Sequence, residues 1–156
     1  MTVNLDKGKK VFFISDAHLG LPPAEESRKR EILLVRWLET IRKDAAAIYL
    51  LGDIFDYWFE YKKVVPRGFV RLIGKLAEIC DEGIPVYFFT GNHDVWVFDY
   101  LPSETGLKVI REPVYHIYNE KKFYLAHGDG LGPGGFSYKF LKSIFTNKVL
   151  QWLYAR

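Results

Sequence analysis

The sequence contains a single cysteine, Cys80, so the chain cannot form an intrachain disulfide. This composition is typical of a reducing compartment. Long hydrophobic runs are also absent, and no stretch approaches the roughly 20 apolar residues that a transmembrane helix needs. The N-terminus has neither the apolar core nor the small-residue cleavage site of a signal peptide. We therefore expect a cytoplasmic protein.

The sequence has little excess charge, with a formal net charge of +3 and a pI of about 8.9. This balance does not favour nucleic acid as a partner. Acidic residues are absent after Asp129, where Lys139, Lys142, Lys148 and Arg156 remain. The basic, amphipathic segment 136–156 predicts either the start of a helical cap that rests on an anionic membrane surface, or a packed helix with a solvated basic edge.

Alternating apolar runs and helical stripes indicate one α/β domain over residues 1–156. Each strand is predicted from a short apolar run, and each helix from apolar residues spaced three and four apart. Strands are expected at 11–14, 46–51 and 85–90, with weaker signals at 107–110, 114–118 and 122–126, and helices at about 22–41, 69–80 and from 136.

Side chains that bind metals follow four of the predicted strands. In an open α/β sheet, the carboxyl ends of the strands gather ligands at one edge. Carboxylate, imidazole and amide groups together suit manganese, iron or zinc, and one carboxylate can bridge two ions. The four groups are Asp16-Ala17-His18, Gly52-Asp53-Ile54-Phe55-Asp56, Gly91-Asn92-His93-Asp94 and His127-Gly128-Asp129.

Each group taken alone has an ordinary explanation. An aspartate two residues before a histidine is common by chance, and Gly-Asp after a strand is often a turn. Asn-His-Asp could cap a helix that starts at Val95. The joint occurrence of the four groups after predicted strands favours a two-metal centre. His116 lies inside a predicted strand and belongs to none of the groups, so we interpret it as an ordinary strand residue.

These four groups, in this order, resemble the calcineurin-like metallophosphoesterases, which have a β-sandwich flanked by helices. The resemblance implies that Asp16, His18 and Asp53 bind one metal, and that Asp53, Asn92 and His127 bind the other. It further implies that His93 faces the phosphate as a charge stabiliser or general acid, oriented by Asp56. The family has one further motif, G-H-x-H, but no histidine follows His127. On this basis we expect a C-terminally incomplete fold, with weak metal binding and slow turnover in these 156 residues alone.

Within the superfamily, residues 13–20 and 52–58 resemble the bacterial UDP-2,3-diacylglucosamine pyrophosphohydrolase group of lipid A biosynthesis, although that group often has Arg where this chain has His93. The resemblance implies two divalent ions, with Mn²⁺ as the favoured metal. It also implies a nucleotide-linked glycolipid substrate and peripheral contact with the inner membrane. Substrate contacts are expected from Trp58, Trp96, Lys139 and Lys142, although the tryptophans could equally be core residues. The alternatives are another nucleotide or nucleic-acid phosphodiesterase, or a non-catalytic scaffold on the same fold.

Overall fold

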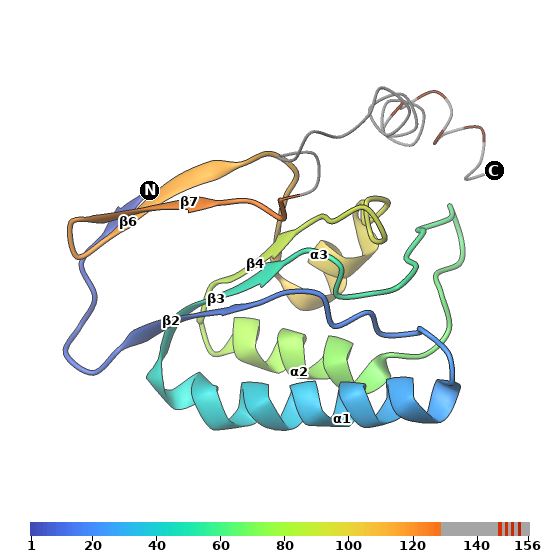
Figure 1. The fold of residues 1–156 in the computed structure, drawn as a ribbon, viewed down its shortest axis with the longest axis horizontal. Helices are drawn as coiled ribbons and strands as arrows, with labels where there is room; N and C mark the ends of the chain where they lie inside the picture. Colours follow the sequence, from blue (N-terminus) through green and yellow to red (C-terminus); the bar gives the residue numbers. More distant parts are fainter. Residues whose placement is uncertain (129–146, 148, 150, 152, 154–156) are drawn as a thin grey trace.

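Two β-sheets form the centre of the computed structural model, which describes residues 1–128, 147, 149, 151 and 153 (Figure 1). The larger sheet is parallel, with strand order β2-β3-β4-β5. The smaller sheet has the order β1-β6-β7, in which β6 and β7 form an antiparallel hairpin and β1 pairs parallel to β6. The strands are β1 (Thr2–Val3), β2 (Lys10–Ile14), β3 (Ala45–Leu51), β4 (Val86–Phe89), β5 (Lys108–Ile110), β6 (Val114–Tyr118) and β7 (Lys121–Leu125).

Helices cover the face of the larger sheet that lies opposite the smaller sheet (Figure 1). The long helix α1 (Ala24–Ile41) runs beside α2 (Val70–Asp81), and the short helix α3 (Tyr100–Thr105) packs against α2. A three-residue 3₁₀ turn, η1 (Arg42–Asp44), joins α1 to β3. The described part of the chain therefore has three layers, with the larger sheet in the middle.

The central strand β3 contributes to a separate core on each face of the larger sheet. Successive side chains of a strand point to opposite faces. Ile48 and Leu50 accordingly pack in the cluster beneath the helices, whereas Ala47 and Tyr49 pack in the cluster between the two sheets. Because β3 is fixed from both sides, the loop at its carboxyl end starts from a rigid point.

The predicted α/β class is confirmed, and each of the six predicted strands has a counterpart whose ends differ by at most one residue. The prediction missed β1, a two-residue strand held by its pairing with β6, and α3, a six-residue helix that is too short for a clear apolar stripe. The predicted cap at 136–156 falls almost wholly outside the described residues. No described helix has the length and apolar character needed to cross a membrane.

Candidate metal centre

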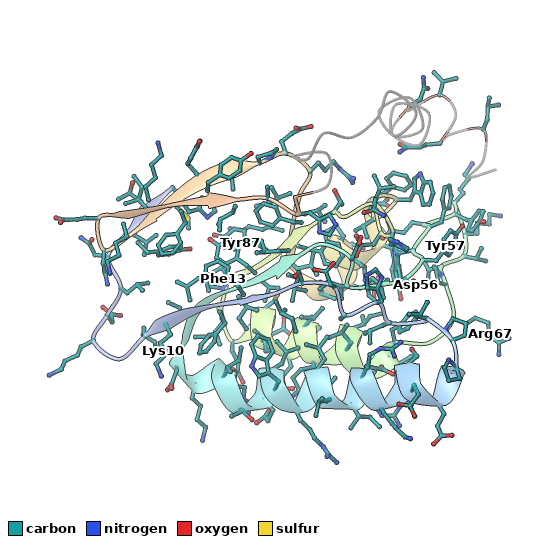
Figure 2. All side chains as sticks on the ribbon, in the orientation of Figure 1. Lys10, Phe13, Asp56, Tyr57, Arg67 and Tyr87 are labelled. Carbon is teal, nitrogen blue, oxygen red and sulfur yellow. The ribbon has the colours of Figure 1, made fainter. Side chains whose placement is uncertain are left out.

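The predicted ligands gather at one end of the larger sheet. Asp16 follows β2, Asp53 follows β3 and Asn92 follows β4, all at the carboxyl ends of parallel strands. Figure 2 shows Asp56 at this end and Lys10, the first residue of β2, at the other. The chain crosses from the smaller sheet to the same end after β7, where His127 packs against the loop after β3.

Asp53 lies between two of the predicted histidine ligands. Its Oδ2 is 3.9 Å from Nε2 of His18 and 3.3 Å from Nε2 of His127. On the outer side, His18 Nε2 is also 3.9 Å from Oδ1 of Asp16. Asp16, His18 and Asp53 each offer a ligand atom, and these three atoms lie within 4.8 Å of one another. These three side chains could hold one ion, and the same Asp53 carboxylate also faces His127.

Hydrogen bonds fix how two of these side chains present their ligand atoms. Nδ1 of His127 lies 2.8 Å from the carbonyl oxygen of Leu51, which can only accept, so Nδ1 donates there and Nε2 is the nitrogen that faces Asp53. Burial alone would raise the pKa of Asp53, but His127 and the main-chain N–H of His93 lower it below the ordinary value. These contacts favour the ionised form of the Asp53 carboxylate beside Nε2 of His127.

The donor set fits a divalent cation. Imidazole nitrogens and carboxylate oxygens are ligands that divalent transition metals accept. Nδ1 of His18 is the only buried side-chain nitrogen or oxygen of the described residues that lacks a hydrogen bond. Asp16, His18 and Asp53 all have positive φ angles, of 55°, 41° and 53°. Such backbone strain in non-glycine residues gathers at functional sites.

Two glycines leave the space that these ligands occupy. Gly52 has a φ angle of 89°, and a Cβ added to it would lie 2.5 Å from Nδ1 of His127. A Cβ on Gly91 would overlap the carboxylate and the main-chain nitrogen of Asp53. Glycine is required at both positions because His127 and Asp53 pack directly against the main chain there, which leaves no space for a Cβ.

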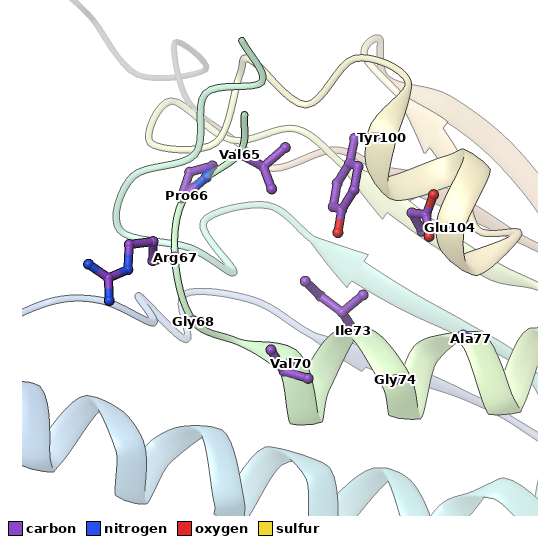
Figure 3. A pocket seen from close by; sticks show the side chains of 10 residues that line it. All are labelled: Val65, Pro66, Arg67, Gly68, Val70, Ile73, Gly74, Ala77, Tyr100 and Glu104. Atoms are coloured by element: carbon purple, nitrogen blue, oxygen red, sulfur yellow. The ribbon is translucent and has the colours of Figure 1, made fainter. Parts of the chain in front are cut away.

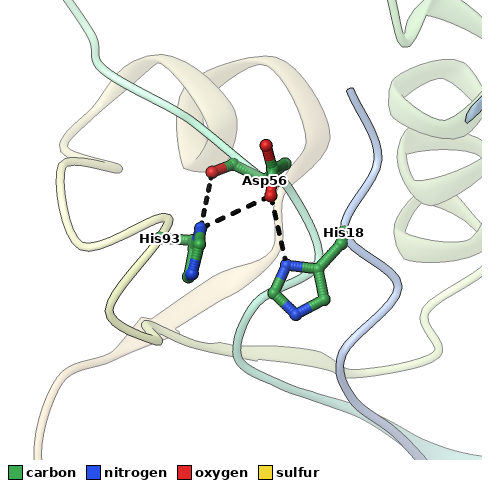
Figure 4. Close-up of side chains that lie close together, drawn as sticks. All are labelled: His18, Asp56 and His93. Atoms are coloured by element: carbon green, nitrogen blue, oxygen red, sulfur yellow. Dashed lines mark hydrogen bonds and ion pairs between the residues drawn. The ribbon is translucent and has the colours of Figure 1, made fainter. Parts of the chain in front are cut away.

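A second cluster, of His18, Asp56 and His93, adjoins the first (Figure 4). Asp56 was expected to orient His93, and the two residues are hydrogen-bonded through the main-chain oxygen of Asp56, 2.8 Å from His93 Nδ1. The Asp56 carboxylate lies between the two rings, with Oδ1 3.5 Å from Nδ1 of each histidine. Asp56 is thus hydrogen-bonded to His93 and lies near Nδ1 of His18 without a hydrogen bond to it.

Asp94, which lies in the third polar group of the sequence without a predicted role of its own, joins two of the ligand loops. Its side chain is fully buried and accepts main-chain hydrogen bonds from Gly91 at 2.7 Å, Ile54 at 2.8 Å, and Asp53 and Phe55 at 3.3 Å each. Burial raises its pKa to about 6 despite these donors. The signal that could have identified it is its place directly after Asn92 and His93 in Gly91–Asp94.

The other predicted site residues lie in different surroundings. Asn92 is exposed, next to His93, whose main-chain N–H donates to Asp53 Oδ1 at 3.0 Å. Trp58 is fully buried and packs against Phe55, so it takes the core role that the sequence left open. Trp96 is partly buried in an aromatic cluster with Tyr57, Phe59, Tyr61 and Phe98, while Lys139 and Lys142 lie outside the described residues.

An apolar hollow of about 480 Å³ lies between the loop after β3 and the two helices α2 and α3 (Figure 3). Tyr100 and Ile73 point toward one another across it. Trp58 stacks on Tyr100 with ring centroids 6.4 Å apart, so this buried tryptophan adjoins the hollow. The lining residues are Val65, Pro66, Arg67, Gly68, Val70, Ile73, Gly74, Ala77, Tyr100 and Glu104.

The parallel sheet under helices carries carboxylates and imidazoles at its carboxyl end, an arrangement suited to divalent metal ions. Family comparison agrees, because residues 9–153 match the calcineurin-like phosphoesterases. The chain belongs to this family, as predicted.

Among curated proteins, the chain is 48% identical to the UDP-2,3-diacylglucosamine hydrolase of Porphyromonas gingivalis, over 94% of this chain and 56% of that protein. It is 31% identical to the enzyme of the same name from Histophilus somni, over 94% of this chain and 60% of that protein. The chain thus spans a little over half the length of these relatives. A solved structure, the nuclease MPE of Pseudomonas putida, aligns with 65% of this chain and 48% of its own at 19% identity and a TM-score of 0.42.

Proposed function

We propose that the protein carrying this chain hydrolyses the pyrophosphate bond of UDP-2,3-diacylglucosamine to UMP and 2,3-diacylglucosamine 1-phosphate. The observation that carries the proposal is the 48% identity to a hydrolase of that name, which extends over 94% of the chain and includes the whole described site. The convergence of Asp16, His18, Asp53 and His127 supports it, because these groups suit the divalent ions that phosphoester hydrolysis uses.

Asp16, His18 and Asp53 would hold one ion, and Asp53, Asn92 and His127 the other. Mn²⁺ is the proposed metal because the ligands mix hard oxygen and borderline nitrogen donors, with Fe and Zn as alternatives. Two such ions, when bound, polarise the phosphoryl oxygens and activate the water that attacks phosphorus.

His93 would act on the substrate and not on the metal. The main-chain oxygen of Asp56 holds the proton on Nδ1, so Nε2 is the atom available to the phosphate. A protonated Nε2 would donate a hydrogen bond to a phosphoryl oxygen as negative charge builds there. In the net reaction, the water oxygen ends on one phosphorus and the bridging oxygen leaves with the other.

A lipid-linked substrate also needs an apolar surface near the membrane, and we propose peripheral contact with the cytoplasmic face of the inner membrane. The loop after β3 supports this, because it carries exposed Lys62, Lys63 and Arg67 beside Val64, which is 63% exposed. Cationic side chains beside an apolar one suit an anionic lipid surface. The proposed contacts of Trp96, Lys139 and Lys142 with substrate belong to the same hypothesis.

The test is UMP release by the full-length protein from UDP-2,3-diacylglucosamine, beside bis-p-nitrophenyl phosphate as a general phosphodiester. We expect Mn²⁺-dependent UMP release, with His93→Ala lowering kcat at least 100-fold while two Mn²⁺ still bind. Hydrolysis of the general diester alone would favour another phosphodiesterase. A protein that hydrolyses neither compound and binds no Mn²⁺ would be a scaffold, and the proposal would fail.

A further inference from the structure

Two loops of the candidate site run side by side after leaving their strands. The main-chain N–H of Trp58 donates to the carbonyl of His93 at 3.3 Å, and that of Glu60 donates to the carbonyl of Trp96 at 3.2 Å. Phe59 and Trp96 form an isolated parallel bridge at the same place. The first loop carries Asp53 and Asp56 and the second carries Asn92 and His93, so their relative register sets the distances within the site.

Glu60 ties the far end of the second loop to the first loop. Its side chain is buried, with the residue only 4% exposed. One carboxylate oxygen, Oε2, accepts from the main-chain N–H groups of Phe98 and Asp99 at 2.7 Å each and from Tyr100 at 3.0 Å. The other, Oε1, accepts from the indole N–H of Trp58 at 3.1 Å and from Leu101 at 3.3 Å.

The main-chain N–H groups of residues 98–101 lie at the start of α3. The N–H groups in the first turn of a helix have no hydrogen-bond acceptors within the helix. Asp99, the residue before α3, makes no capping hydrogen bond with its side chain. Glu60 therefore supplies from a distant loop the negative charge and the acceptors that a local cap would give.

Arg111 holds the same loop through its carbonyl groups. It directly follows β5, and its guanidinium donates to the main-chain oxygen of Val95 at 3.2 Å and to that of Val97. The guanidinium carbon also lies 5.8 Å from the centre of the Phe98 ring. Carbonyls of residues 95 and 97 thus point to Arg111, while N–H groups of residues 98–101 point to Glu60.

We propose that Glu60 and Arg111 are positioning residues that hold the 92–101 segment in register with the loop after β3. Through that register they fix Asn92 and His93 against Asp53 and Asp56. Neither touches the proposed ligand atoms, and their effect on catalysis rests on the function proposed above. Metal affinity and backbone order report on the register without any substrate.

The test uses Glu60→Gln in the full-length protein, with Glu31→Gln as the matched control. Gln keeps the shape of the side chain but turns one acceptor oxygen into an amide donor that faces N–H groups. Glu31 is equally buried, at 3% exposure, and accepts from Arg71 and Leu72 at the start of α2. The control therefore removes the same kind of helix-start contact away from the two site loops.

We expect Glu60→Gln to speed amide hydrogen exchange at residues 98–101 at least tenfold and to weaken Mn²⁺ binding about tenfold in calorimetric titration. At saturating Mn²⁺, kcat should fall at least tenfold while KM stays within threefold, because the change displaces His93. Glu31→Gln should lower the unfolding temperature yet keep exchange at 98–101, Mn²⁺ affinity and kcat within twofold of the wild type. Equal behaviour of the two variants in exchange and Mn²⁺ affinity would overturn the proposal.

Arg111→Lys gives a second test that does not depend on a buried substitution, since Arg111 lies at the surface. Lysine keeps the charge but cannot donate to two carbonyls in the planar fork of arginine. Mn²⁺ affinity should fall at least threefold, and an unchanged affinity would overturn the role of Arg111. If the wild type bound Mn²⁺ but released no UMP, the proposed function would fail. Amide hydrogen exchange and Mn²⁺ titration would still decide whether Glu60 and Arg111 are positioning residues.

Discussion

Replacing Asp94 with asparagine tests whether one buried carboxylate holds the metal loops together. Asp94 accepts four main-chain hydrogen bonds, two on each oxygen, from the turn at Gly91 and the loop at Asp53–Phe55. Asparagine fills the same space but keeps only one oxygen, so one pair of N–H groups loses its acceptor and faces an NH₂ group instead. The local geometry of Asp53 should loosen as a result.

The magnitude follows from those two lost bonds. Each buried N–H left without an acceptor costs about 1–3 kcal/mol, and removal of a buried charge offsets part of that cost. We expect a net loss of about 2–4 kcal/mol from a total free energy of unfolding of about 5–15 kcal/mol. With a urea dependence of about 2 kcal/mol per molar, the unfolding midpoint should fall by about 1–2 M.

The assay is urea unfolding at pH 8 followed by tryptophan fluorescence, with Asp99→Asn as the control. Asp99 is exposed and makes no capping bond, so its substitution should change stability by less than about 0.5 kcal/mol. In Mn²⁺ titration of the folded proteins, Asp94→Asn should bind at least tenfold more weakly. A midpoint and an affinity equal to those of the wild type would refute the role assigned to Asp94.

Two further predictions concern space and protonation. Gly91→Ala should reduce Mn²⁺ affinity at least tenfold, because the added Cβ would overlap Asp53. The control Gly74→Ala lies in open space within α2, so it should leave the affinity unchanged and stabilise the protein by about 0.5–1 kcal/mol. Equal Mn²⁺ affinities for these two variants in calorimetry would contradict the packing argument. Burial, together with the charged N-terminus, lowers the pKa of His116 below its ordinary value of 6.5. As pH falls, the imidazole of His116 is therefore protonated in the unfolded chain before it is protonated in the folded protein, so the free energy of unfolding should drop below about pH 6.5. In urea unfolding at pH 5–8, His116→Gln should make that drop shallower by up to about 1.4 kcal/mol per pH unit. The same slope in both proteins would show that His116 does not contribute.

The strands and the candidate ligands could be predicted because both are encoded locally. Val11 to Ile14 and Ala46 to Leu51 are apolar runs, which a strand buried on both faces needs, and the polar groups follow them directly. Topology then brings separate groups to one edge, since all strands of the larger sheet are parallel. Spacing in the sequence was therefore enough to place Asp16, Asp53 and Asn92 at the same end.

The supporting residues could not be predicted, because their partners are distant in sequence and are mostly main-chain atoms. Glu60 follows an aromatic run and reads as a surface charge, yet it is buried against N–H groups about forty positions away. Arg111 bonds to carbonyls, which every sequence offers equally. Asp56 was expected to orient His93, but the sequence could not say that its main-chain oxygen would lie closer to the ring than its carboxylate, because loop geometry sets those distances.

Three of the candidate metal ligands have a strained backbone conformation. The positive φ angles of Asp16, His18 and Asp53 each carry a cost of about 1–3 kcal/mol, which the surrounding structure has to offset. Main-chain hydrogen bonds do so in part, because Asp16 donates to Gly52 at 3.1 Å and His18 donates to Asp53 at 3.0 Å.

The carboxylate of Asp94 then fixes the other side of Asp53. Each of these contacts joins atoms of the protein itself. Main-chain hydrogen bonds that fix the backbone of His18 and Asp53 reduce the ordering that metal binding would require. The buried carboxylates that accept main-chain hydrogen bonds are therefore as much part of the metal centre as the side chains that would touch the ions.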